Sequence, residues 1–375
     1  MNNFPTIGQE EILWLILLAT PAVIIIFYYS FIFTAILKKG RESNSNEGVS
    51  VIVCAKNEEQ NLKKLIPILL SQNYEKYEVI IINDGSWDGS HQYLEELSQS
   101  YSILKNIFLD PNKKIQSGKK LAITLGIKSA KFNQLLFTDA DCIPNTENWI
   151  KSMSHCKTPK RDIVLGYSPY VKNKGLLNWF IRTETQLTAF MYLGAAGRGF
   201  NYMSVGRNWS YSKEAFFAVK GFAKNQHIMA GDDDLQLQEF SKKGFKSSIN
   251  SHSDSFVFSE PKKTWSEWIN QKRRHLQIGN HYNFGQKLYT GIFSLAHFWF
   301  WIALPVIWLL KPTLWPYIAV ILGTKVIVTW AMSIALANKL KDWKTMAFQP
   351  FAEFGIMSYW LLMSIYVFFT KKKEW

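Results

Sequence analysis

The sequence predicts an α/β domain, built on a mostly parallel sheet with helices on both faces, joined to transmembrane helices. Short apolar runs alternate with helix-patterned segments between residues 49 and 167. This alternation is typical of parallel strands joined by crossover helices. Apolar stretches long enough to cross a bilayer stand near both ends of the chain. We therefore expect a catalytic or binding domain held between membrane helices.

Composition also favours a membrane protein. The chain has 375 residues, of which 47% are hydrophobic and 15% aromatic, and its formal net charge is +14. Long apolar runs with a basic balance favour contact with anionic membrane lipids. Nucleic acid would also explain the charge, but no nucleic-acid-binding motif accompanies it, so we expect no nucleic-acid partner. Cys54, Cys142 and Cys156 lack metal-ligand spacing and are expected to be reduced packing residues.

The first apolar stretch, residues 12–37, contains no charged side chain. It exceeds the ~20 residues that a membrane-crossing helix needs. A cleaved signal peptide is the alternative, but its apolar core would span ~7–15 residues after a basic segment. Lys38, Lys39 and Arg41 follow the stretch. The positive-inside rule then places the next domain in the cytoplasm.

Polar clusters follow three of the strands expected in the α/β domain. The expected strands are 49–54, 77–82, 103–109 and 135–138, and the expected helices between them are 58–70, 89–97 and 119–131. The clusters are Ala55-Lys56-Asn57-Glu58, Asn83-Asp84-Gly85-Ser86 and Asp139-Ala140-Asp141. The second cluster also fits an ordinary turn. Because ligands of such sheets bind beyond the carboxyl ends of the strands, the clusters together predict one binding edge.

Asp139 and Asp141 are candidate metal ligands. Residues i and i+2 of an extended chain face the same side, so both carboxylates can meet one ion. Two hard oxygen ligands suit Mg²⁺ or Mn²⁺, with a ligand diphosphate completing the shell. A polar loop after a strand is the alternative. Gly118-Lys119 opens a helix at which a phosphate could bind, although a solvated lysine has the same sequence.

A run of three acids, Asp232-Asp233-Asp234, stands at the start of a helix expected at 235–242. Acids at a helix start are favoured by the helix dipole alone. Three in a row repel one another, which raises the proton affinity of one carboxylate and suits a general base. Before them, residues 206–209 are expected to form a glycine-bearing loop that leads into another helix.

Two segments are patterned as amphipathic helices. In residues 174–200 the polar side is made by Arg182, Thr183, Glu184 and Gln186. This helix can pack on the domain or lie at the membrane surface. Residues 265–275 are basic and aromatic, which fits an interfacial helix or a gate whose Arg274 meets a diphosphate; one helix can do both.

Three apolar segments, residues 288–310, 313–337 and 354–370, close the chain. Lys325 is the one charged residue inside the second, and a charge at mid-span is usually paired. We expect its partner to be Glu353. Three full crossings would put the lysines at 371–373 outside, against the positive-inside rule. Either one segment is re-entrant or interfacial, or the tail breaks the rule.

These observations divide the chain into five parts and predict a multi-pass protein of the cell or inner membrane. The parts are an N-terminal transmembrane helix (1–39), a linker (40–48), a cytosolic domain (49–260), an amphipathic interface segment (261–287) and C-terminal transmembrane helices (288–375).

The ordered motifs resemble the membrane-bound family 2 inverting glycosyltransferases, among them the hyaluronan, cellulose, chitin and poly-N-acetylglucosamine synthases and ceramide glucosyltransferase. The resemblance covers roughly residues 49–280. It implies a GT-A fold, a nucleotide-sugar donor, most often a UDP-sugar, and a divalent metal. By this analogy the donor nucleotide would be held by Ala55, Asn57, Glu58, Asp84, Lys119 and Asp139, and the metal by Asp139 and Asp141.

The same resemblance makes Asp233 the catalytic base. Asp232 replaces the more common Glu before it. Gln271 and Arg274 match the QxxRW motif of the family, with His275 where Trp is usual, so these three residues and Asp232 are expected on the acceptor or diphosphate side. Asp233 would take the proton of an acceptor hydroxyl while the metal and Arg274 stabilise the departing diphosphate.

The acceptor is a lipid, a lipid-linked group or a growing glycan. About four spans with one internal charge make a poor secretion channel, and His275 weakens the resemblance to processive enzymes, so we favour a lipid acceptor. A nucleotide-binding membrane protein without chemistry is the alternative outside this class, but it would be expected to lose Asp141 or Asp233. A metal-dependent nucleotidyltransferase fits the late acidic cluster poorly.

Overall fold

The chain forms two compact units, which the computed structural model describes over residues 8–38, 47–111, 118–156, 162–228 and 230–370. One unit is Lys38–Trp265; the other joins Met1–Leu37 to Ser266–Trp375. Most of the expected linker, with Lys39 and Arg41, lies outside the described residues, as do the lysines at 371–373. The five domain boundaries set from the sequence remain a prediction.

The first unit is built on a mostly parallel, seven-stranded sheet with the order β3-β2-β1-β4-β7-β6-β8. The strands are β1 (Val49–Ala55), β2 (Tyr77–Asn83), β3 (Leu104–Phe108), β4 (Gln134–Asp139), β6 (Ile163–Gly166), β7 (Trp209–Ser212) and β8 (Ser247–Asn250). The first four run parallel, β7 runs antiparallel to β4 and β6, and β8 is parallel to β6. A two-stranded antiparallel sheet joins β5 (Cys142–Pro144) to β9 (Val257–Ser259).

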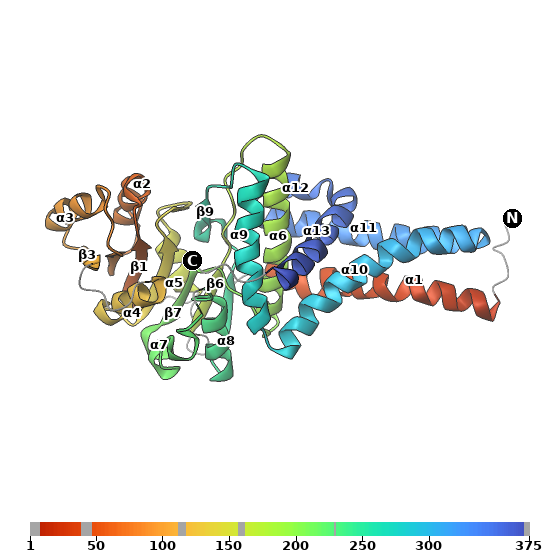
Figure 1. Ribbon diagram of the computed structural model, residues 1–375, viewed down its shortest axis with the longest axis horizontal. Coiled ribbons are helices and arrows are strands. Elements are labelled where there is room, and N and C mark those ends of the chain that lie inside the picture. The colour runs from red at the N-terminus through yellow and green to blue at the C-terminus, as the bar shows by residue number, and fades with distance from the viewer. Residues whose placement is uncertain (1–7, 39–46, 112–117, 157–161, 229, 371–375) are drawn as a thin grey trace. The chain divides into compact units, whose positions relative to one another are not determined.

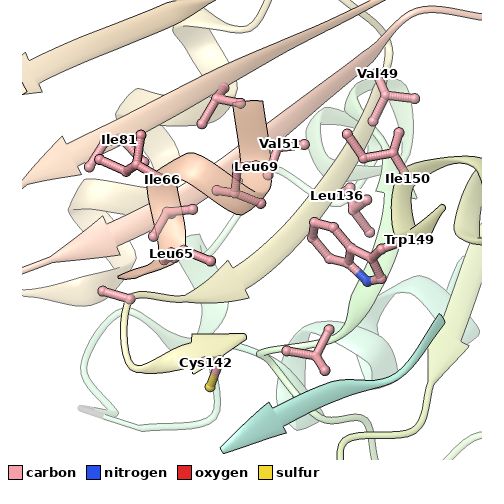
Figure 2. Close-up of a cluster of buried hydrophobic side chains, with 14 of the residues drawn as sticks. Val49, Val51, Leu65, Ile66, Leu69, Ile81, Leu136, Cys142, Trp149 and Ile150 are labelled. Carbon is pink, nitrogen blue, oxygen red and sulfur yellow. The ribbon is translucent and has the colours of Figure 1, made fainter. Parts of the chain in front are cut away.

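Helices cover this sheet and enclose its core. They are α2 (Glu59–Leu70), α3 (Ser90–Ser100), α4 (Lys119–Ser129), α5 (Trp149–His155), α6 (Leu176–Gly197), α7 (Lys213–Ala218) and α8 (Asp234–Lys242). Figure 2 shows Leu65, Ile66 and Leu69 of α2 in the buried cluster that includes Val49 and Val51 of β1. Burying such side chains contributes roughly 1.5–3 kcal/mol each. The β1, β2 and β4 ends are therefore fixed on a rigid support.

The sequence missed strand β7. Residues 206–209 were expected to be a loop before a helix, but Trp209 begins β7, and α7 follows directly at Lys213. The strand is fully buried and only four residues long, so its alternation of aromatic residues and serines is at the lower limit of length for a strand pattern. Its antiparallel pairing with β4 places Gly206 and Arg207 beside the end of the central strand.

The amphipathic interpretation of residues 174–200 is wrong. The side chains expected on a polar outer face are all buried: Arg182, Thr183, Glu184 and Gln186. Leu176, an apolar residue at the start of the same helix, is 71% exposed. Residues are buried on every side of α6, so periodicity could not identify an outer face.

The second unit contains the four helices that are long and apolar enough to cross a membrane: Gln9–Leu37, Phe284–Leu310, Pro312–Lys339 and Gln349–Phe369. They comprise α1 (Gln9–Phe27) with its continuation to Leu37, α10 (Phe284–Leu310), α11 (Trp315–Lys339) and α13 (Gln349–Phe369), with the short α12 (Trp343–Met346) before the last. α9 (Trp265–Ile278) precedes α10 along the chain. In Figure 1, α1, α10 and α11 run together, as their packing requires.

A buried ion pair joins α11 to α13, as the sequence predicted. The ammonium of Lys325 donates a hydrogen bond to the carboxylate of Glu353, and both side chains are at most 2% exposed. His297 of α10 lies 3.1 Å from the same carboxylate, and Gln349 donates to its other oxygen at 3.0 Å. Three helices therefore converge on Glu353.

Candidate active site at the carboxyl end of the sheet

Hydrogen bonds tie the loops after β1 and β2 into one rim. The backbone N–H of Asp84 donates to the carbonyl of Ala55 at 2.8 Å, and that of Asn57 donates to the Ser86 hydroxyl at 2.9 Å. Ser86 N–H in turn donates to the Asn83 side chain at 2.9 Å. Asn57 has φ +57°, the left-handed region that Asn tolerates better than most residues. Asn83–Ser86 therefore makes the hydrogen bonds of a turn, and its binding role remains a prediction.

Lys119 connects two acidic clusters that are far apart in sequence. Its ammonium lies 2.9 Å from Asp139, at the end of β4, and 3.1 Å from Asp232, before α8. Burial alone would lower the pKa of Lys119, but these two carboxylates raise it above its ordinary value. Both acids line a small pocket together with Lys119, and apolar and aromatic side chains, among them Phe137 and Trp209, line the same pocket. The lysine is therefore a fixed cation at the sheet edge.

Asp139, Asp141 and Cys142 place one candidate ligand atom each within 4.8 Å of the others. Two carboxylate oxygens fit Mn²⁺ or Mg²⁺, which prefer oxygen ligands. The Cys142 thiol is buried and lies 3.0 Å from the Ser259 hydroxyl, so it is already engaged in packing β5 against β9. We regard the two carboxylates as the fitting donor set, in agreement with the i, i+2 spacing.

Asp233 caps helix α8 and is held by two backbone groups. Its Oδ2 accepts a hydrogen bond from Gly206 N–H at 2.8 Å, and its Oδ1 accepts one from Asp234 N–H at 2.7 Å. Burial and, second, the charge of Asp232 together raise the pKa of Asp233 to about 6, against the lowering effect of Lys119. Repulsion among the acids was expected to be the main cause, but burial is larger. The carboxylate is oriented and poised near neutral pH.

Sequence reasoning missed Lys120. Its ammonium donates to three backbone carbonyls, those of Asn225 (2.7 Å), Ile228 (2.6 Å) and Ala230 (3.0 Å). This segment leads directly into Asp232 and Asp233. Two consecutive lysines at the start of α4 therefore hold the segment that carries the acids. Lys119 binds the side chain of Asp232, and Lys120 binds backbone carbonyls of the residues before it. The only sequence signal was a second lysine beside Lys119.

The structure brings most of the predicted residues to one edge but not all. Four of them lie at or just after the carboxyl ends of adjacent strands: Ala55, Asp84, Asp139 and Asp141. The contacts above join Lys119, Asp232 and Asp233 to them. Glu58 accepts a hydrogen bond from Asn61 at 2.6 Å, while burial raises its pKa. Gln271, Arg274 and His275 are on α9 in the helical unit. Their part in the site remains a prediction, as do the individual roles of the others.

Comparison with known structures shows the GT-A fold. The chain is similar to a mannosyltransferase of Pyrobaculum calidifontis, solved with GDP-Man and Mn²⁺, with a TM-score of 0.60 at 15% identity over 96% of this chain and 99% of that one. The mixed sheet described above agrees with this fold. The expected α/β fold class with membrane-length helices is confirmed.

Sequence relatives are also glycosyltransferases. The chain is 30% identical over 161 residues to a poly-beta-1,6-N-acetyl-D-glucosamine synthase of Staphylococcus epidermidis, which is 42% of this chain and 38% of that protein. It is 33% identical over 105 residues to glycosyltransferase AglE of Haloferax volcanii, 28% of this chain and 33% of that protein. The chain thus spans less than two fifths of these curated relatives.

Family models cover most of the chain. The model described as "Glycosyl transferase family 2" matches residues 50–219, and the one described as "Glycosyl transferase family group 2" matches residues 135–370. The second match exceeds half of the chain and runs from β4 through the last membrane-length helix. The chain belongs to the family 2 group of glycosyltransferases.

Proposed function

We propose that this chain is a membrane-embedded, inverting glycosyltransferase that moves a sugar from a nucleotide sugar to a lipid or lipid-linked acceptor, with Asp233 as general base. The observation that carries the proposal is the convergence of Lys119 on Asp139 and Asp232, next to Asp233. One edge of the sheet thereby offers a cation for a diphosphate, carboxylates for a metal and a base with a pKa of about 6.

The reaction is a single displacement. The acceptor oxygen forms a bond to the anomeric carbon, its proton passes to Asp233, and the bond from that carbon to the diphosphate breaks, releasing a nucleoside diphosphate. Attack from the opposite face inverts the anomeric configuration. Asp139 and Asp141 would hold a Mn²⁺ or Mg²⁺ ion, which supplies charge stabilisation to the diphosphate when bound. Lys119 adds a second positive charge at the same edge.

The donor is expected to be a UDP-sugar, held at Ala55, Asn57, Glu58 and Asp84. This follows the resemblance of the motifs, and the named relative in Staphylococcus epidermidis is an N-acetylglucosamine polymer synthase. The Pyrobaculum neighbour was solved with GDP-Man, so guanosine donors belong in the same test.

A lipid acceptor is favoured by the interior of the helical unit. Lys325, Glu353 and His297 fill the space where three helices meet, and each is at most 2% exposed. A polysaccharide moving between these helices would have to break this cluster. Polymer synthesis is the second candidate, because the sequence relatives of the chain include polymer synthases.

The test is transfer in lipid. Purified protein in native lipid extract would receive Mn²⁺ and radiolabelled UDP- and GDP-sugars, and products would be separated by chain length. A single labelled lipid supports the proposal, whereas a ladder of long products supports the polymer synthase. Asp233→Asn should abolish transfer with donor binding intact, and Glu214→Gln, an exposed carboxylate on α7, is the matched control. Loss of donor binding in Asp233→Asn would instead indicate a structural role.

A further inference from the structure

Side-chain contacts among α1, α10, α11 and α13 define the direction in which α13 runs. α1 and α10 run antiparallel, because Glu10 pairs with Lys311 at 2.8 Å, Leu17 accepts from Trp299 at 3.1 Å, and Tyr28 donates to the carbonyl of Tyr289 at 2.6 Å. α11 returns from α10 through the turn Pro312–Leu314. These three helices therefore share one long axis, with the turn at one end and the start of α10 at the other.

α13 does not follow that axis toward the turn. Glu353 contacts His297, and Phe354 packs near Trp301 with ring centroids 6.4 Å apart. Seven residues after Glu353, Trp360 packs near Phe293 at 6.4 Å. A helix that crossed toward the turn would reach residues beyond 301 of α10. Instead the contacts move back toward the start of α10.

The first turn of α13 also stays at this level. Gln349 donates to the Tyr29 hydroxyl at 3.4 Å, and the Tyr29 ring lies 6.3 Å from Phe293 and 6.5 Å from His297. Contacts from 349 to 360 thus fall between 293 and 301 of α10. His297 is 13 residues before the end of α10, about 20 Å from the turn at 1.5 Å per residue. That depth is two thirds of a hydrocarbon core of ~30 Å.

We propose that α13 does not cross the membrane a fourth time. It begins beside α11, lies obliquely across α10 and ends on the side of the membrane to which residues 38–265 belong, with its apolar outer face in the lipid interface. Chain connectivity defines that side. The first helix ends at Leu37, directly before residues 38–265, and α9 connects the same residues to the beginning of α10. α13 is also the least apolar of the four candidate spans, and its side chains Phe351, Phe368 and Phe369 are each at least 78% exposed.

This arrangement removes the conflict in charge distribution. Three crossings place residues after 370 on the same side as Lys38, so that the lysines at 371–373 obey the positive-inside rule. The interfacial alternative, which the sequence left open, is favoured. The exposed Phe side chains of α13 and the lysines that follow it in sequence fit a helix held near the lipid headgroups.

Single cysteines test the topology in the full-length protein. Thr370→Cys reports the end of α13, Thr313→Cys the turn between α10 and α11, and Lys220→Cys the domain, with wild type as the blank for its own thiols. Each is labelled with a membrane-impermeant maleimide in right-side-out and in inverted vesicles. We expect Thr370→Cys to label in the same vesicles as Lys220→Cys and opposite to Thr313→Cys.

Labelling of Thr370→Cys together with Thr313→Cys would overturn the proposal. A second measurement does not depend on the substitution: fusions of green fluorescent protein and of alkaline phosphatase after Trp375 should be fluorescent and inactive, respectively, if the end lies in the cytoplasm. An active phosphatase fusion would also overturn it. Neither result depends on the enzymatic activity proposed above.

Discussion

Asp233 is expected to titrate in the pH range where the transferase is assayed. Burial raises the pKa of its carboxyl from 3.8 to about 6, with Asp232 as the second cause. A general base works only when ionised. With a pKa of about 6 it is ~90% ionised at pH 7 and ~10% at pH 5. The rate at low acceptor concentration should therefore fall about tenfold between pH 7 and pH 5.

An aspartate with the ordinary pKa of 3.8 would behave differently. It would remain more than ~90% ionised at pH 5, and the rate would be nearly flat over the same interval. The assay is initial-rate transfer from labelled donor at half-unit steps of pH, with donor binding measured separately at each step. Donor binding that is constant from pH 5 to pH 7 assigns the fall in rate to the base.

Asp232→Asn tests whether the charge of Asp232 raises the pKa of Asp233. Removing the adjacent negative charge should lower the pKa of Asp233, so the midpoint of the remaining activity should move to lower pH, while burial keeps it above 3.8. A flat wild-type profile between pH 5 and pH 7 would refute this reasoning about Asp233. So would a midpoint that moves to higher pH in Asp232→Asn.

Three further changes test other contacts. Lys120→Met should lower kcat by up to ~10²-fold with donor affinity unchanged, because the segment before Asp232 loses three hydrogen bonds. Lys120→Arg should keep part of the rate. Equal losses of rate in both variants would contradict a positioning role for Lys120. Removal of divalent ions with a chelator should stop sugar transfer until Mn²⁺ is returned. Asp141→Asn should raise the Mn²⁺ concentration that transfer requires. Transfer in excess chelator would exclude the assignment of a metal to this site. Lys325→Met should cost ~3–5 kcal/mol in unfolding measurements in detergent, since it leaves the Glu353 carboxylate buried without its lysine partner. Lys325→Met/Glu353→Gln should recover part of the loss, and an equally unstable double variant would contradict the pairing.

The sequence predicted those parts of the fold that local patterning controls. Strands β1, β2 and β4 are continuous apolar runs with polar clusters at their carboxyl ends, and both features are legible without a structure. Strand β7 was missed because its alternation of aromatic residues and serines spans only four residues. The buried polar side of α6 was missed because a helical pattern distinguishes faces but not the partners that cover them.

At the site, the sequence did not predict contacts between residues that are far apart along the chain. Asp139 and Asp141 could be paired from a spacing of two residues, but nothing in the sequence placed Lys119 between Asp139 and Asp232, which are 93 positions apart (232 − 139). Lys325 and Glu353 were paired because an unpaired charge between apolar helices is costly, and that cost leaves few candidate partners. In the α/β domain many polar groups could satisfy a lysine, so Lys120 had no predictable partner, and its three acceptors proved to be backbone carbonyls.

The two lysines at the start of α4 suggest how donor binding and the base are coupled. Lys119 shares its ammonium between Asp139, one of the proposed metal ligands, and Asp232, which precedes the proposed base Asp233. A metal ion with its diphosphate would compete for Asp139 and draw Lys119 toward the phosphate charge, which weakens its effect on the acids before α8. Because Lys119 lowers the pKa of Asp233, such a shift would raise that pKa and make the carboxylate a stronger base once the donor is bound. Lys120 holds the segment before these acids through three backbone carbonyls.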